Sequence, residues 1–232
     1  MIFAMNPKDT IRKLRVIFRI LIDLVPFSIL FRFSNQPNTD LLSPRSISLK
    51  TILTIDGFPR SANTFSFYHI ISFIPGVLIA HHRHTWQQIF LSCLLGKPTF
   101  VLIRNPQDAV SSLITKKQYY TPFIAYLEYL VFYFPLLLFS GYQVIPFQLA
   151  IDPLLLRQYF ISQNCLSPSL FTQLDDENVS RLMRSRTNHK NKATAPVEND
   201  SFLYRFMLGI SEKVYQALLS RVVYYKSFVL PD

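Results

Sequence analysis

Cysteine and glycine are scarce in this sequence of 232 residues, which contains only 2 cysteines and 5 glycines. Cys93 and Cys165 lie in apolar surroundings, and neither belongs to a C-x-x-C pair or to a Cys/His metal pattern. This scarcity argues against a disulfide-stabilised secreted domain and indicates a reducing compartment, so we expect a cytoplasmic protein. We expect no metal site.

Acidic residues are also few, with 14 Asp and Glu against 24 Lys and Arg, which gives a formal net charge of +10. Such an excess predicts an anionic partner or substrate, such as a nucleotide, a phosphorylated or sulfated sugar, or a lipid headgroup. Nucleic acid is the least supported partner, because the aromatic residues lie in apolar helical segments and are not interleaved with lysines. Half of the residues are hydrophobic, which excludes a disordered chain.

Long uninterrupted apolar runs are absent, although the mean hydropathy is +0.22. Residues 16–33 are broken by charged residues and a proline, and residues 123–139 contain Glu128 and Pro135. Neither segment is expected to cross a membrane, and the second predicts a buried helix.

The N-terminal arm is basic and amphipathic. Residues 9–25 predict a helix with apolar residues at helical spacing on one side and Arg12, Arg15 and Arg19 on the other. Packing on the domain with a solvated face is the favoured interpretation, and peripheral contact with a membrane or an acidic partner is the alternative. We expect residues 1–47 to form this arm and a linker, and residues 48–232 to form one domain.

Predicted strands and helices alternate through the middle of the sequence. Strands are expected at 48–56, 77–80, 98–103 and 143–147, and helices at 64–73, 85–95, from 107 onward, at 121–138 and in the segments after 150. This alternation predicts an α/β three-layer sandwich with a central parallel sheet and a helical C-terminal part.

The stretch GFPRSANTF, residues 57–65, joins the first predicted strand to a helix. Backbone N–H groups at such a junction, together with the helix dipole, form an anion site. Against the pattern G-x-x-x-x-G-K-[ST], the glycine is Gly57, but Asn63 occupies the lysine position. The only cation of the loop is Arg60, which favours binding of a terminal phosphate or phosphosulfate.

A second stretch, VLIRNPQDAVSS, residues 101–112, repeats the plan of a buried strand, an arginine, a turn and a helix. The guanidinium group of Arg104 suits bidentate phosphate binding, and Ser112 lies about two helical turns further on. Asp108 is interpreted as a helix cap. Because ligands of open parallel sheets gather at the carboxyl ends of the strands, we expect Arg60 and Arg104 to share one site.

These two stretches resemble the nucleotide-binding motifs of the sulfotransferases. GFPRSANTF is similar to their 5′-phosphosulfate loop and VLIRNPQDAVSS to their 3′-phosphate motif, in the family's order and 44 residues apart from Arg60 to Arg104. The resemblance implies the P-loop-like sulfotransferase fold and transfer of a sulfuryl group from 3′-phosphoadenosine-5′-phosphosulfate (PAPS) to an acceptor hydroxyl of a carbohydrate or small metabolite. No metal is required.

The resemblance also assigns binding residues. Those implied to hold the 5′-phosphosulfate are Arg60, Ser61, Ala62, Asn63 and Thr64, and those implied to hold the 3′-phosphate are Arg104 and Ser112. Arg60 is also expected to stabilise the leaving phosphate, on which negative charge develops. A late basic loop of the family points to Lys190. The sequence departs from the family at Ala62, where glycine is common, and at Phe147-Gln148, where a tyrosine-glutamate pair is common.

The catalytic base is sought in HHRHTW, residues 81–86, because the family often places a histidine in this region. A neutral imidazole can take the proton from an attacking hydroxyl. His84 and His82 are the candidates, at strand-alternate positions on one face, with His81 pointing away. A solvated polar strand end is the alternative for these histidines.

Two other functions stay open for the whole chain. One is a P-loop phosphotransferase or kinase, against which Asn63 speaks. The other is a non-catalytic protein whose basic arm binds a membrane or a partner and whose nucleotide site is vestigial.

Overall fold

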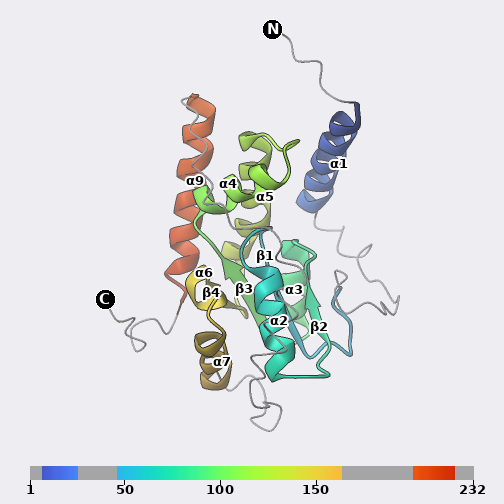
Figure 1. The fold of residues 1–232 in the computed structure, drawn as a ribbon, viewed down its shortest axis with the longest axis vertical. Helices are drawn as coiled ribbons and strands as arrows, with labels where there is room; N and C mark the ends of the chain where they lie inside the picture. The colour runs from blue at the N-terminus through green and yellow to red at the C-terminus, as the bar shows by residue number, and fades with distance from the viewer. Residues whose placement is uncertain (1–6, 26–45, 164–200, 223–232) are drawn as a thin grey trace.

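The computed structural model of this protein describes residues 7–25, 46–163 and 201–222. Its centre is a sheet of four parallel strands in the order β2-β1-β3-β4 (Figure 1). The predicted α/β class with a parallel sheet is therefore confirmed.

The strands are β1 (Leu53–Gly57), β2 (Ile79–His81), β3 (Thr99–Ile103) and β4 (Gln143–Pro146). The helices between them are α2 (Asn63–Phe73), α3 (Trp86–Leu94), α4 (Pro106–Lys116), α5 (Pro122–Tyr133) and the 3-10 turn η2 (Pro135–Leu138). The helices outside the sheet region are α1 (Pro7–Leu24), α6 (Phe147–Ala150), α7 (Pro153–Ser162) and α9 (Phe202–Leu219).

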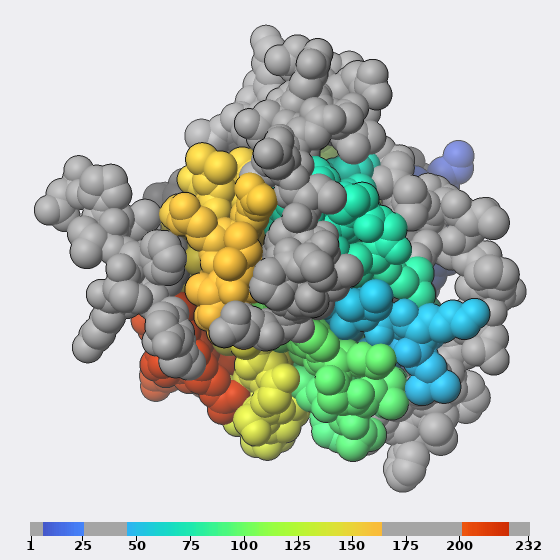
Figure 2. All heavy atoms as spheres, turned by 90° about the horizontal axis from the view of Figure 1, so that it is seen from below, coloured from blue at the N-terminus to red at the C-terminus, as the bar shows by residue number. Residues whose placement is uncertain are grey.

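Both faces of the sheet are covered, because successive strand side chains point to opposite faces. On β3, Val101 and Ile103 join a hydrophobic cluster with α4, α5 and α9. Phe100 and Leu102 join a second cluster with α2 and α7. Figure 2 shows α2 and α7 side by side on their face, with α9 at the edge, and α2 and α7 are in contact. Burial on both faces explains why the strands read as continuous apolar runs.

The chain reverses its direction of travel across the sheet between β1 and β3. From the central strand β1 it moves outward to β2, and from β2 it returns past β1 to β3. The loops that follow β1 and β3 therefore leave the sheet in opposite directions, and open α/β sheets bind ligands at the carboxyl ends of the strands where the order reverses in this way.

Most predicted elements are present, with two changes of boundary. The first strand begins at Leu53 and not at residue 48, and the helix expected to reach residue 138 ends at Tyr133. Pro135 explains the second change, because proline has no N–H to donate to the helix. A helix expected within residues 167–185 lies outside the described residues.

The predicted N-terminal helix is present as α1 and packs on α5. Arg19 forms an ion pair with Glu128 of α5, whose second carboxylate oxygen accepts a hydrogen bond of 2.7 Å from Tyr120. The backbone carbonyl of Asp23 accepts hydrogen bonds from Trp86 and Gln87, both of 2.7 Å. The helix is thus anchored through a side that was expected to face solvent.

Gly57 allows β1 and β3 to pair at the edge where the loops begin. A Cβ atom built on Gly57 would collide with the carbonyl oxygen of Leu102 and lie 2.8 Å from its Cβ. Both partners belong to the paired strand, so neither can move without breaking the ladder. Any side chain at this position must therefore separate the strands.

We predict that Gly57→Ala destabilises the protein by about 3 kcal/mol or more in urea unfolding, because overpacking here strains backbone. Gly209→Ala is the matched control. A Cβ there meets nothing within 4 Å in α9, and alanine favours a helix by about 0.8–1 kcal/mol over glycine. An equal response of the two variants would contradict this explanation.

Candidate functional site at the carboxyl edge of the sheet

The loop of residues 58–62, called here the first loop, connects β1 to α2 in a curled conformation. Arg60 and Ala62 have φ angles of 77° and 67°, in the left-handed region that glycine favours. The side chain of Asn63 donates hydrogen bonds to the carbonyls of Gly57 (3.3 Å) and Phe58 (2.9 Å). Asn63 therefore fastens the loop to the first turn of α2.

The first turn of α2 has backbone N–H groups that no side chain of its N-cap residue satisfies. That residue is Ala62, and it makes no side-chain cap hydrogen bond. The opening N–H groups of a helix have no partner within the helix, and the dipole makes this end positive. The anion site expected at the first loop stays a prediction, and the uncapped start of α2 is the feature on which it depends.

The loop of residues 104–105, called here the second loop, connects β3 to α4. Asn105 caps the helix, because its Oδ1 accepts from the backbone N–H groups of Gln107 (3.0 Å) and Asp108 (3.3 Å). The prediction that Asp108 is the cap is wrong. Asp108 lies in the first turn, where its charge complements the helix dipole.

The two loops are joined by hydrogen bonds of their arginines. Arg60 donates through Nε to the hydroxyl of Ser112 on α4 at 2.9 Å. Arg104 donates through Nη1 to the carbonyl of Arg60 at 3.1 Å, and its guanidinium lies 4.2 Å from the ring centre of Phe147. Residues predicted from two separate motifs therefore form one contiguous cluster.

This cluster is electropositive. Burial lowers the pKa of the Arg60 guanidinium, and burial together with the charge of Arg60 lowers the pKa of Arg104, against the opposing effect of Asp108. Among the described residues, no carboxylate forms a salt bridge with Arg60 or Arg104. Two partly desolvated cations held together, with neither in a salt bridge among the described residues, favour the binding of an anion.

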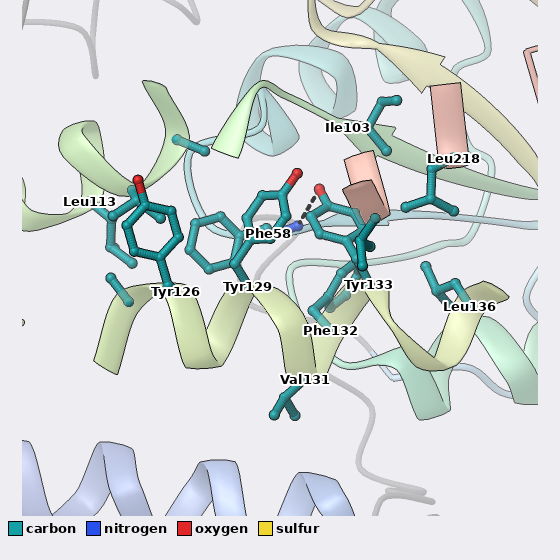
Figure 3. Packing of buried hydrophobic residues seen from close by; sticks show 14 of the residues in the cluster. Phe58, Ile103, Leu113, Tyr126, Tyr129, Val131, Phe132, Tyr133, Leu136 and Leu218 are labelled. Carbon is teal, nitrogen blue, oxygen red and sulfur yellow. Dashed lines mark hydrogen bonds between the residues drawn. The ribbon is translucent and has the colours of Figure 1, made fainter. Parts of the chain in front are cut away.

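Two tyrosines of α5 support the loops from below. Tyr133 donates to the carbonyl of Leu102 at 2.6 Å, accepts from the N–H of Phe58 at 3.2 Å and lies 3.3 Å from the hydroxyl of Ser61. One turn earlier, Tyr129 donates to the carbonyl of Arg104 at 3.0 Å. Figure 3 shows both side chains on the sheet side of α5, with Phe58 beside them.

The histidines of residues 81–84 do not follow the predicted strand alternation. Strand β2 ends at His81, and His82 and His84 have φ angles of 57° and 54° in the loop that follows. His81 does not point away either, because its Nδ1 lies 2.6 Å from Nδ1 of His82 and its ring stacks on Phe67. The strand assignment failed because β2 is only three residues long.

His84 lies against the buried carboxylate of Asp56. Its Nδ1 is 3.2 Å from Asp56 Oδ1 and 2.7 Å from the carbonyl of Gly57. Burial opposes the charged imidazolium, but Asp56 and the Gly57 carbonyl outweigh burial and raise the pKa of His84. The other oxygen of Asp56 accepts from the backbone N–H groups of Arg83 and His84, each at 2.9 Å. Asp56 and His84 therefore organise the loop after β2.

His82 faces the first loop and is held neutral. Its Nε2 lies 3.0 Å from the hydroxyl of Thr64, in the first turn of α2. Burial lowers its pKa to about 4, although Asp56 acts in the opposite direction and His84 in the same one. His82 is thus an unprotonated imidazole beside the first turn of α2 at neutral pH.

Other predictions about the site concern residues and groups away from this edge. Lys190 and Cys165 lie outside the described residues. Within residues 7–25, 46–163 and 201–222, no group of three His, Cys, Asp or Glu side chains could hold a metal ion. In the same ranges, none of the helices combines the length and the apolar character needed to cross a membrane.

Comparison of the chain with protein-family models, curated proteins and solved structures found no match. The function is therefore argued below from the residues of the site.

Sequence reasoning missed five residues of the site. The predicted site residues did not include Tyr129, Tyr133, Asn105, Asp56 and Phe147. The four-residue spacing of Tyr129 and Tyr133 was a usable signal, because it places two hydroxyl groups on one side of a helix. Asn105 directly before Pro106 was another, since proline is common at the first helical position after an asparagine cap.

We predict that Tyr133→Phe destabilises the protein by about 2–4 kcal/mol, because it removes the partner of a buried N–H group and a buried carbonyl. Tyr129→Phe removes a single hydrogen bond from an equally buried ring, and we expect a cost of about 1 kcal/mol. Urea unfolding compares the two variants. A cost for Tyr133→Phe no larger than that for Tyr129→Phe would contradict a central role for this hydroxyl.

We also predict that His82 makes the protein less stable as the pH falls from 6.5 to about 4. In this window the unfolded chain binds a proton at residue 82 that the folded chain does not bind. His82→Asn removes this contribution, on the order of 3 kcal/mol over the window, so the loss of stability on acidification becomes smaller. Urea unfolding at several pH values measures the slope.

His84→Asn provides the contrast, because the raised pKa of His84 acts in the opposite direction. Its stabilisation is fully present below the ordinary histidine pKa and is lost as the pH rises through the raised value. We expect His84→Asn to flatten the decline of stability above pH 6.5. If the stability of the wild type and that of His82→Asn change equally with pH between 4 and 6.5, His82 is not the cause of the loss of stability at acidic pH.

Proposed function

We propose that this protein is a sulfotransferase that moves a sulfuryl group from PAPS to an acceptor hydroxyl. The observation that carries the proposal is the pairing of Arg60 and Arg104 at the carboxyl ends of β1 and β3. Hydrogen bonds of 2.9 Å to Ser112 and 3.1 Å to the Arg60 carbonyl hold the pair. PAPS carries two separate anionic groups, and each loop offers one arginine.

The first loop suits the 5′-phosphosulfate. The N–H groups at the start of α2 and the partly buried Arg60 are fixed donors, which stabilise charge on the leaving phosphate without reorganisation during the reaction. Thr64 adds a hydroxyl group at the same end of the helix, whereas Ser61 is buried with its hydroxyl against Tyr133 and can contribute its backbone. The backbone of Ala62 already has the left-handed φ angle that a glycine in the related loops would supply.

The second loop suits the 3′-phosphate. Stacking on Phe147 and the hydrogen bond to the Arg60 carbonyl fix the orientation of the Arg104 guanidinium. Ser112 accepts from Arg60, and its own hydroxyl proton is available for an anion. Phe147, one of the departures from the family pattern, thereby supports the cation. The part that Lys190 plays in this subsite stays a prediction.

His82 is a better candidate for the general base than His84. His82 is neutral, and its Nε2 already lies 3.0 Å from Thr64 at the anion site. In the reaction, the acceptor oxygen forms a bond to sulfur, the bond from sulfur to the 5′-phosphate oxygen breaks, and His82 takes the hydroxyl proton. His84 is less suited to this role, because its Nδ1 donates to the carbonyl of Gly57 and Asp56 raises its pKa.

A P-loop phosphotransferase is less well supported. In the proposed alignment, Asn63 takes the place of the phosphate-binding lysine, but its amide is directed to the carbonyls of Gly57 and Phe58. A side chain engaged in closing the loop cannot also neutralise a triphosphate. We therefore expect no tight binding of Mg-ATP.

Calorimetric titration with 3′-phosphoadenosine-5′-phosphate, the spent donor, tests the proposal. Adenosine 5′-phosphate, which lacks the 3′-phosphate, should bind at least tenfold more weakly. Arg104→Ala should weaken the binding of the spent donor roughly 10- to 100-fold, because a hydrogen bond to a charged group contributes about 1.5–3 kcal/mol. Arg205→Ala, at an exposed position on α9, removes the same charge and should leave affinity unchanged.

Each other outcome argues against the proposal. Equal affinity for both nucleotides would remove the role of Arg104 as a 3′-phosphate residue. Tight binding of Mg-ATP in place of the spent donor would favour the phosphotransferase. An absence of nucleotide binding by folded protein would overturn a catalytic function at this site.

A further inference from the structure

Helix α1 turns one side toward the domain, and that side is not its most apolar one. Val16, Ile20 and Asp23 are buried, and Arg19 on the neighbouring turn forms the ion pair with Glu128. Figure 3 shows Val131 of α5 pointing toward α1, away from the tyrosines that face the sheet. The contact with the domain is therefore a narrow strip.

The opposite side of α1 is a continuous apolar surface that is exposed to solvent. Its residues, each 40–66% exposed, are Ile11, Leu14, Ile17, Phe18, Leu21, Leu24 and Val25. Their spacing of three and four residues places them along one side of the helix. In Figure 1, α1 stands at the periphery of the molecule, so this outer apolar face looks away from the body.

Exposed apolar surface of this extent has a function in most proteins. Burial of apolar area is favourable, and large contiguous exposed patches mark sites that contact a partner or a membrane. Scattered exposed residues need no such explanation. Here six large apolar side chains of a single helix, and Val25 directly after it, are exposed together.

Basic residues run along one border of the outer apolar face. Lys8, Arg12 and Arg15 follow one another at spacings of four and three residues and are exposed. An apolar face beside a row of Lys and Arg is the pattern of a helix that lies in a membrane interface, where the basic residues contact anionic headgroups. The net charge of +10 draws the whole molecule toward such a surface.

Pairing with a second copy of the chain is less favourable on the same grounds. Two copies that met through this face would bring their rows of Lys8, Arg12 and Arg15 close together, and like charges repel. An anionic lipid surface neutralises the basic row and buries the apolar residues at the same time. The charge pattern therefore favours an anionic lipid surface over a second copy of the chain as the partner of this face.

We propose that the outer apolar face of α1 docks the protein on an anionic lipid surface, with the helix lying in the plane of the interface. This binding is peripheral and needs no helix that crosses the membrane. It does not depend on the proposed sulfotransferase activity, because none of its residues belongs to the loops at the sheet edge.

Cosedimentation of the full chain with vesicles tests the proposal. We expect binding to vesicles of 70% phosphatidylcholine and 30% phosphatidylglycerol, and at least tenfold weaker binding to pure phosphatidylcholine. Raising the salt concentration from 0.1 to 0.5 M should weaken the binding, because salt screens the attraction of Arg15 and its neighbours to the headgroups.

Two variants and a matched control locate the contact. The double substitution Leu14→Ser with Phe18→Ser removes two side chains that are 60% and 66% exposed, and Arg15→Glu reverses one charge. Each should reduce binding about tenfold or more. The control is Leu94→Ser with Leu138→Ser, which removes two apolar side chains that are 70% and 78% exposed elsewhere. It should bind as the wild type does.

Urea unfolding establishes that the variants are folded, and sedimentation velocity reports their oligomeric state. A wild-type chain that does not bind the anionic vesicles would overturn the proposal, as would a control that loses binding as strongly as the α1 variants. A wild-type dimer that Leu14→Ser with Phe18→Ser dissociates would also overturn it, since a second copy would then occupy the face.

Discussion

Two strand ends and one loop meet at a single buried hydroxyl group, that of Tyr133. It donates to Leu102 on β3, accepts from Phe58 directly after β1 and contacts Ser61 in the first loop. Burial raises the pKa of Tyr133, so the group stays protonated and can act as donor and acceptor at once. The separation of Arg60 and Arg104 depends on this arrangement, because each follows one of the strands that the hydroxyl joins.

Helix α5 is consequently the common support of the molecule. On its sheet side, Tyr129 and Tyr133 hold both loops, and on its other side Glu128 receives Arg19 of α1. A helix that is in contact on both sides must be buried along most of its length, which explains its composition of aromatic and aliphatic residues. The same composition makes the segment resemble a membrane span in hydropathy, although Glu128 and Pro135 mark it as a core helix.

The sequence predicted the elements better than it predicted the way in which they meet. Apolar periodicity is local, so the strands around Ile55 and Val101 and the helices after them could be recognised. The neighbourhood of Arg60 and Arg104 also followed, because parallel strands present their carboxyl ends at one edge. The spacing of Tyr129 and Tyr133 could show that their hydroxyl groups share one side of a helix, but the partners of these hydroxyl groups depend on how α5 packs.

The histidines after β2 and helix α1 are two further places where the local sequence pattern could not predict the contacts of the side chains. His82 and His84 do not alternate as strand residues, because both have left-handed φ angles that turn the chain just after β2. No glycine stands in this segment to indicate such a turn in the sequence. In α1, the amphipathic pattern correctly predicted a helix, but it could not reveal which side contacts the domain. The ion pair of Arg19 with Glu128 orients the helix on the domain, and it joins residues that are 109 positions apart in the sequence.

The backbone at the sheet edge is conformationally frustrated. Within the described residues, the non-glycine positions with positive φ are Arg60, Ala62, His82 and His84, and all of them lie in the two loops that leave β1 and β2. Each costs about 1–2 kcal/mol relative to an ordinary backbone, so together they consume a considerable part of the 5–15 kcal/mol by which domains are usually stable. The strained residues lie at the carboxyl edge of the sheet, and none of them is part of a strand. The chain has thus concentrated its conformational cost in the two loops that hold Arg60 and His82, and it keeps their shape with side chains that glycine could not provide.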